Sequence, residues 1–110
     1  MSMNILGLMG VEKTPIIQDE TIPTQTASIE VVGAGTTSAN GIYTWSDGLW
    51  IKTGLPNYAI FRAGSGWQIF SDEIENEFKY SNNGGDASNL PRFDWNVEDG
   101  TAPAPQINIA

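Results

Sequence analysis

The stretch Trp45-Ser46-Asp47-Gly48-Leu49-Trp50 decides how this chain folds. Asp-Gly is a strong signal for a two-residue type I′ turn, because both central positions of that turn need a positive φ angle. A hairpin closed at Asp47-Gly48 places Trp45 opposite Trp50 in a non-hydrogen-bonded pair, in which cross-strand side chains come closest. The sequence therefore predicts short antiparallel strands joined by tight turns and supported by aromatic pairs.

The same register divides the hairpin over residues 42–52 into two faces, because alternate residues of a strand point to opposite sides. One face carries Tyr43, Trp45, Trp50 and Lys52, and the other carries Ile42, Thr44, Leu49 and Ile51. Both faces contain apolar side chains. Either the hairpin is buried on both sides, or one face is exposed to a ligand or a partner.

A second hairpin is predicted over residues 57–71, with its turn at Gly64-Ser65 and with Arg62 opposite Trp67. One of its faces carries Tyr58, Ile60, Trp67 and Ile69, and the other carries Phe61 and Phe70. Shorter strands are predicted at residues 28–32, at 78–80 and near 93–97, with a loop and a turn through Asn40-Gly41 after the first of them.

Composition limits the chain to one small domain and excludes several kinds of chemistry. The 110 residues contain no cysteine and no histidine, which excludes disulfide bonds, thiol catalysis, histidine acid–base catalysis and the usual zinc sites. A net charge of −8 disfavours binding to phosphate backbones and to anionic membranes. Residues 1–8 contain a short apolar run without a positively charged flank, so we expect neither a signal peptide nor a membrane span there.

The N-terminal residues differ in pattern from the rest of the chain. They follow neither the period of a strand nor that of a helix, and Pro15 and Pro23 favour extended backbone. Their apolar side chains need a partner surface, and we expect these residues to bind it: Ile5, Leu6, Leu8, Ile16 and Ile17. We therefore expect an extended attachment arm at residues 1–26, a compact β domain at 27–101 and an extended tail at 102–110.

These elements together predict an all-β fold. The architecture that we expect is a small antiparallel barrel or sandwich of about six short strands, flanked by the N-terminal arm and the C-terminal tail.

An outline of single residues and short motifs runs through residues 29–107. It consists of Gly33-Ala34-Gly35, Asn40-Gly41-Ile42-Tyr43, Tyr58-x-Ile60, Trp67-x-Ile69, Tyr80-Ser81-Asn82, Pro91, Trp95 and Gly100-x-x-Pro103-Ala104-Pro105. This outline resembles a small β module of bacteriophage virion proteins, including fibres, and of some large modular surface proteins. The resemblance implies a building block rather than an activity. One such module behind a short arm suits an accessory virion protein, such as a capsid decoration, adaptor or fibre-base subunit.

The function that we expect is that of a non-catalytic structural subunit, not an enzyme, with no cofactor and no bound metal. Its expected partners are virion structural proteins or sister subunits of a homo-oligomer, reached through the arm. We expect no nucleic-acid or membrane partner. The expected location is the virion, after synthesis in the host cytoplasm.

The main alternative is a carbohydrate-binding module, because sugar rings stack on flat aromatic faces. Tyr43, Trp45, Trp50 and Lys52 would form that ligand face if the two tryptophans were exposed rather than part of the core. Other chemistry has less support. Ser65 lies in a hairpin turn without a histidine to activate it, the acidic run at 72–77 lacks a cleft for glycoside hydrolysis, and residues 94–105 match a calcium loop poorly.

Overall fold

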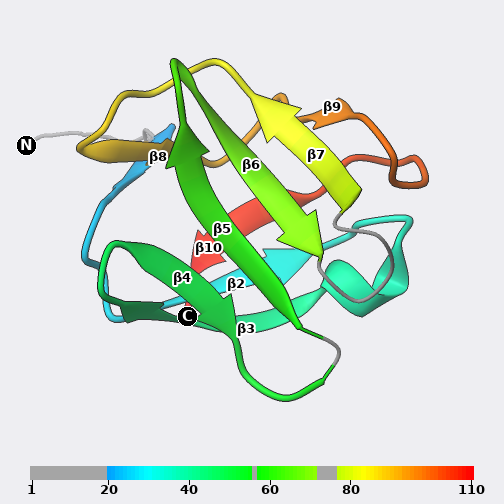
Figure 1. Ribbon diagram of the computed structural model, residues 1–110, viewed down its shortest axis with the longest axis horizontal. Helices are drawn as coiled ribbons and strands as arrows, with labels where there is room; N and C mark the ends of the chain where they lie inside the picture. The colour runs from blue at the N-terminus through cyan, green and yellow to red at the C-terminus, as the bar shows by residue number, and fades with distance from the viewer. Residues whose placement is uncertain (1–19, 56, 72–76) are drawn as a thin grey trace, which may run out of the picture.

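Eight strands form one curled antiparallel sheet in this computed structural model, which describes residues 20–55, 57–71 and 77–110 (Figure 1). Their order is β10-β2-β3-β4-β5-β6-β7-β9, and β1 and β8 pair in a separate small sheet. The strands are β1 (Thr21–Pro23), β2 (Ser28–Val32), β3 (Gly41–Ser46), β4 (Leu49–Lys52), β5 (Tyr58–Ala63), β6 (Gly66–Ser71), β7 (Glu77–Asn82), β8 (Asn89–Pro91), β9 (Asn96–Val97) and β10 (Gln106–Ile109). The predicted all-β fold is confirmed, with more strands than expected because several span only two to four residues.

The tryptophan hairpin of β3 and β4 forms with the predicted register. The Asp47-Gly48 turn has φ angles of 50° and 100°, and Trp45 pairs with Trp50. Their ring centroids lie 4.8 Å apart at an interplanar angle of 71°, which is an edge-to-face contact. In the second hairpin Arg62 pairs with Trp67 as predicted, and its guanidinium carbon lies 5.8 Å from the ring centroid.

The inner, concave face of the large sheet holds the core. Its fully buried side chains include Ile29, Val31, Tyr43, Trp50, Ile60, Ile69, Tyr80 and Ile107. Three indole N–H groups donate to backbone carbonyls of neighbouring segments: Trp50 to Thr26 at 2.8 Å, Trp67 to Asp86 at 3.2 Å and Trp95 to Pro91 at 3.1 Å. The tryptophans thus bury their rings without leaving a buried donor unpaired.

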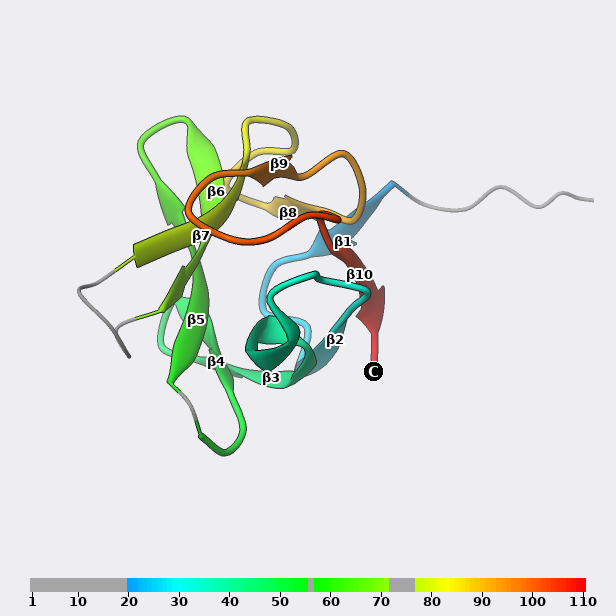
Figure 2. The same ribbon diagram turned by 90° about the vertical axis from the view of Figure 1, so that its right-hand side faces the viewer.

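A short 3₁₀ turn, η1 (Thr37–Ala39), covers one end of the curled sheet, where the sequence predicted only a loop (Figure 1 and Figure 2). Three tyrosine hydroxyls attach this segment to the sheet. Tyr43 donates to the Ala39 carbonyl at 2.7 Å, Tyr58 bonds to the Ser38 hydroxyl at 2.8 Å, and Tyr80 accepts from the Thr36 N–H at 3.0 Å. The expected turn at Asn40-Gly41 is corrected, since Asn40 is extended and Gly41 begins β3.

The folded domain extends past the predicted boundaries at both ends. Ile22, in the expected arm, is fully buried in β1, which pairs with β8. Ile107, in the expected tail, is fully buried in β10, which pairs with β2 at the edge of the large sheet. The boundaries after residues 26 and 101 are corrected accordingly, because both segments bury an apolar side chain and pair their backbones.

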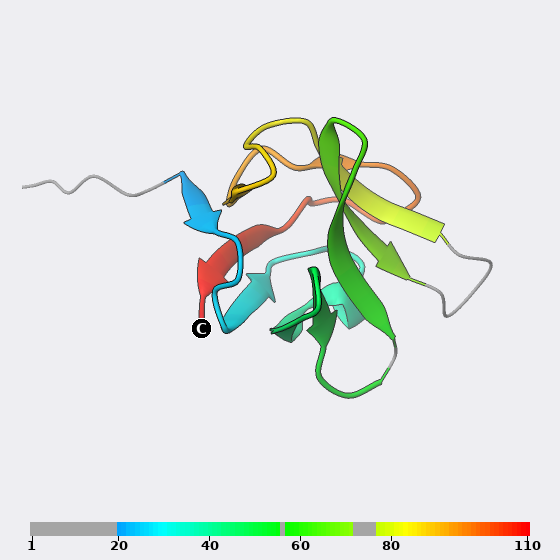
Figure 3. The same cartoon turned by 60° about the vertical axis from the view of Figure 1, so that its left-hand side comes forward.

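The two sheets meet where β1 and β10, drawn in blue and red, lie side by side (Figure 3). Arg92 joins them. Its backbone N–H donates to the Glu20 carbonyl at 2.9 Å, and its side-chain Nε and Nη2 donate to the Ile107 carbonyl and to Asn108 Oδ1, each at 2.9 Å. The arm residues Ile5, Leu6, Leu8, Ile16 and Ile17, and most of the acidic run, lie outside the described residues.

Candidate functional site

The ligand face suggested by the sequence does not form as an exposed surface. Tyr43 and Trp50 are fully buried, and the Trp50 ring centroid lies 5.8 Å from that of Trp67. Trp45 is half-buried against Trp50, and Lys52 Nζ donates to the Leu55 carbonyl at 3.4 Å. The expectation of a stacking platform is corrected here, because a small domain without disulfides needs its largest rings as core.

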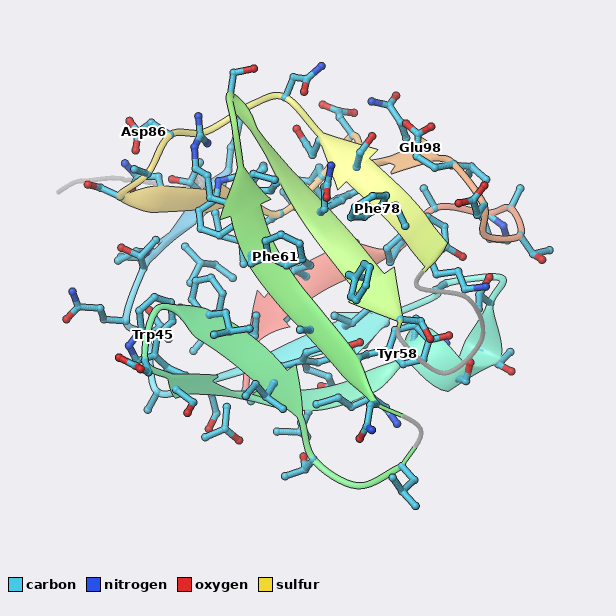
Figure 4. The ribbon with its side chains drawn as sticks, viewed as in Figure 1. Trp45, Tyr58, Phe61, Phe78, Asp86 and Glu98 are labelled. Atoms are coloured by element: carbon cyan, nitrogen blue, oxygen red, sulfur yellow. The ribbon has the colours of Figure 1, made fainter. Side chains whose placement is uncertain are left out.

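The opposite, outer face of the same strands is apolar and open. We define the outer apolar face by the side chains that β4 to β7 place on it: Leu49, Ile51, Ala59, Phe61, Phe70 and Phe78. Phe78 is 40% exposed to solvent and Ile51 is 43% exposed. Figure 4 shows Phe61 on β5 and Phe78 further along the same face. A ligand or partner therefore meets phenylalanines and aliphatic side chains here, not the tryptophans.

The three phenylalanines form a continuous aromatic row across β5, β6 and β7. The Phe61 and Phe70 centroids lie 5.9 Å apart at 77°, and those of Phe70 and Phe78 lie 5.2 Å apart at 54°. These distances fall within the range of favourable aromatic pairs. The row is therefore a contiguous apolar surface that spans three strands.

A β-bulge in β7 completes the aromatic row. Ile69 pairs with Tyr80 while Phe70 pairs with Phe78, so Lys79 is an extra residue in β7. Strict alternation would place Phe78 and Tyr80 on the same side of the sheet. The bulge instead lets Tyr80 enter the core while Phe78 stays outside. The sequence predicts the strand but not the bulge, because two aromatic residues at this spacing resemble ordinary alternation.

An open groove of about 670 Å³ crosses the outer apolar face between β4 and β5. Its described lining consists of Gly48, Leu49, Ile51, Asn57, Tyr58, Ala59, Phe61, Arg62 and Phe70. Arg62 is the one charged residue among them, although the whole chain is strongly acidic. The groove is thus an apolar, non-acidic region of an acidic molecule.

Two buried polar atoms of β5 and β6 lack a hydrogen-bond partner within residues 20–55, 57–71 and 77–110. They are Arg62 Nη1, a donor, and Gln68 Oε1, an acceptor. Gln68 pairs in register with Phe61 and therefore shares the outer face. Arg62 pairs with the buried Trp67, its guanidinium lies over that ring, and its Nη2 donates to the Ser65 carbonyl at 3.0 Å. An unpaired buried polar atom costs about 1–3 kcal/mol, so a partner that donates to Gln68 Oε1 would relieve that cost on the outer face.

Two other groups have shifted pKa values for structural reasons. Burial raises the pKa of the Tyr43 hydroxyl, and the neighbouring Tyr58 adds to this rise. Hydrogen bonds from the Ser88 backbone N–H and then from the Asn89 side chain lower the pKa of Asp86. The first group supports η1 and the second shapes the exposed loop before β8, so neither shift marks a reaction centre.

The described part of the chain offers few alternative sites. It contains no group of three or more acidic residues that could hold a metal ion. Its one helical element is the single turn η1, so no described helix has the length or apolarity to cross a membrane. The outer apolar face with its groove remains the candidate site.

Comparison with known proteins assigns the chain to no family. No family model, no curated protein and no solved structure matches it. The fold and the site define the class in structural terms only: a small all-β domain with an apolar row of phenylalanines on the outside of its sheet.

Proposed function

We propose that this chain is a non-catalytic structural subunit of a larger assembly, in which the outer apolar face is a protein–protein interface. The observation that carries the proposal is the exposure of Ile51 and Phe78 beside the Phe61–Phe70 pair. The largest contiguous apolar patch on a protein surface often marks an interaction site. Clustered aromatic side chains also supply much of the binding energy at interfaces.

The assembly that we propose is a bacteriophage particle, with the chain acting as a capsid decoration, adaptor or fibre-base protein. The support is the resemblance of residues 29–107 to the β module of virion proteins. An attachment segment before β1, with Ile5, Leu6, Leu8, Ile16 and Ile17, fits the same role. The net charge of −8 favours a position away from packaged nucleic acid.

A non-enzymatic role agrees with the chemistry of the chain, which has no cysteine or histidine to act as nucleophile or base. Ser65 serves a turn, where its carbonyl accepts a hydrogen bond from Arg62. The carbohydrate-binding alternative depended on Tyr43 and Trp50, and both of these rings are fully buried.

The proposal is tested by incorporation of tagged chains into particles of the phage that encodes the protein. We expect the natural chain to co-purify with particles at a constant ratio. The Ile51→Lys variant puts a charge into the proposed interface, and we expect at least about tenfold less of it, which corresponds to about 1.4 kcal/mol. The matched control is Val97→Lys, at a position of similar exposure (40%) in β9.

Either of two results would contradict the proposal. Particles that lack the natural chain would refute the virion role. Equal incorporation of Ile51→Lys and Val97→Lys would show that the outer apolar face is not the interface.

A further inference from the structure

We propose that the groove on the outer apolar face binds the N-terminal segment, residues 5–17, of a second copy of this chain. The inference deepens the proposed function, because it names the occupant of the interface on which that function rests. Each subunit then offers one segment to a neighbour and accepts one segment in its own groove.

The groove and the segment match in apolar character. The groove presents Leu49, Ile51, Ala59, Phe61 and Phe70, and the segment carries Ile5, Leu6, Leu8, Ile16 and Ile17. Residues 5–17 carry one acidic and one basic side chain, Glu12 and Lys13, which cancel in net charge. In a chain of net charge −8, a segment without net charge can approach a neighbouring subunit without the like-charge repulsion that two acidic surfaces experience.

An unpartnered polar atom on the outer face favours a peptide as the occupant. Gln68 Oε1 has no donor within the described residues, and Gln68 pairs in register with Phe61, which lines the groove. An extended peptide backbone presents N–H donors along its whole length, whereas a purely apolar ligand presents none. Pro15 favours the extended backbone that such a peptide needs.

The position of β1 favours binding between copies over binding within one copy. Figure 2 shows β1 on one side of the molecule and β4 and β5, which carry the groove, on the other. The chain before Glu20 therefore joins the folded domain on the side away from its own groove (Figure 2). A neighbour placed on that side presents its groove directly to the segment.

Such a contact is heterologous, because the two surfaces that meet are different. Repeated head to tail, heterologous contacts build closed rings or open filaments. A ring or filament of this kind would suit the symmetric surface of a particle.

The test compares purified full-length chains by light scattering and analytical ultracentrifugation. The groove variant is Ile51→Lys, with Val97→Lys as its control. The segment variant is Leu6→Asp with Leu8→Asp, and its control adds the same charges through Ser2→Asp with Asn4→Asp. We expect the natural chain and both controls to form one oligomer and each variant alone to be monomeric.

Mixing the two variants gives the decisive result. The intact segment of the groove variant can enter the intact groove of the segment variant, so the mixture should form a heterodimer and nothing larger. Circular dichroism verifies folding, and Leu49→Lys replaces the groove variant if Ile51→Lys does not fold.

Three outcomes would overturn the inference. A segment variant that still forms the oligomer means that copies associate without the N-terminal segment. A natural chain that is monomeric at every concentration means that no contact between copies exists. A mixture that stays monomeric means that segment and groove do not bind each other. None of these three results bears on the virion proposal, which is tested separately by incorporation of the chain into particles.

Discussion

Trp50 shows at the level of one residue how the core is held together. It is fully buried, and its ring contacts Trp45 at 4.8 Å and Trp67 at 5.8 Å between centroids. Its indole N–H donates to the Thr26 carbonyl, which lies in the connection from β1 to β2. One side chain therefore joins the tryptophan hairpin to the second hairpin and to the small sheet.

Replacing Trp50 by alanine should lower the free energy of unfolding by about 3–5 kcal/mol, because the change leaves a large cavity in the core. Trp45→Ala is the matched control and should cost less, since that ring is half-buried. Urea denaturation followed by circular dichroism measures both. An unchanged midpoint for Trp50→Ala would contradict its place in the core.

Tyr43 makes stability depend on alkaline pH. Burial raises the pKa of its hydroxyl in the folded state, whereas the unfolded chain has the ordinary value of about 10. Its contribution to stability is therefore complete below about pH 10 and is lost above that value, because only the unfolded state ionises there.

The Tyr43→Phe variant should lose stability less steeply than the natural chain between about pH 9 and 11. At neutral pH it should be less stable by about 1 kcal/mol, because the hydrogen bond to the Ala39 carbonyl is removed. Melting temperatures measured across this range provide the comparison. Identical slopes for the two chains would show that Tyr43 is not the group responsible.

At the level of elements, β7 decides which aromatic residues belong to the core and which to the surface. The extra residue Lys79 puts Tyr80 and Phe78 on opposite sides of the sheet. Tyr80 lies in the core, where its hydroxyl donates to the Thr101 carbonyl at 2.7 Å, and Phe78 lies on the outer face. The bulge thus serves both the inner core and the outer aromatic row.

Deletion of Lys79 should destabilise the domain by about 3 kcal/mol or more, because a one-residue shift moves either Tyr80 out of the core or Phe78 into it. Lys79→Ala keeps the residue count and should retain the register. Chemical denaturation compares the two, and chemical shifts of the aromatic rings report the register. Equal stability of deletion and substitution would argue against the bulge as a register device.

At the level of the whole molecule, the two sheets depend on segments that the sequence analysis placed outside the domain. β1 buries Ile22 against the core, β10 buries Ile107, and Arg92 bridges the two strands. The curl of the large sheet brings these ends together (Figure 3).

Two N-terminal deletions should separate arm from domain. Deleting residues 1–19 should leave the monomer's free energy of unfolding within about 1 kcal/mol, since it keeps β1 and the Glu20 carbonyl that accepts from Arg92. Deleting residues 1–23 also removes Ile22 and should cost about 2–5 kcal/mol. Denaturation of dilute protein, below the concentration of any oligomer, measures both. Equal stabilities would contradict the role of β1.

The parts of the fold that the sequence predicted well depend on short-range chemistry. The Asp47-Gly48 turn sets the register of its hairpin, so the Trp45–Trp50 pair could be predicted from the sequence alone. The Arg62–Trp67 pair followed in the same way from the Gly64-Ser65 turn. A two-residue turn leaves the flanking strands one register, whatever the rest of the molecule does.

The site could be predicted only in part. Alternation along the second hairpin put Phe61 and Phe70 on one face and Tyr58 and Ile60 on the other. Because both faces are apolar, the pattern did not predict which of them is buried. The sequence also suggested that Tyr43, Trp50 and their neighbours form a ligand face, whereas burial assigns Tyr43 and Trp50 to the core.

By itself, the sequence determined the all-β class, the two hairpins and the partners within each of them, because turns and cross-strand pairs are local. Only the tertiary structure decided which side of the sheet is buried. The curl of the large sheet, the η1 segment at one end of it and the strands β1 and β10 cover one apolar face and leave the other open. Those contacts join residues far apart in the chain, so no local sequence pattern predicts them.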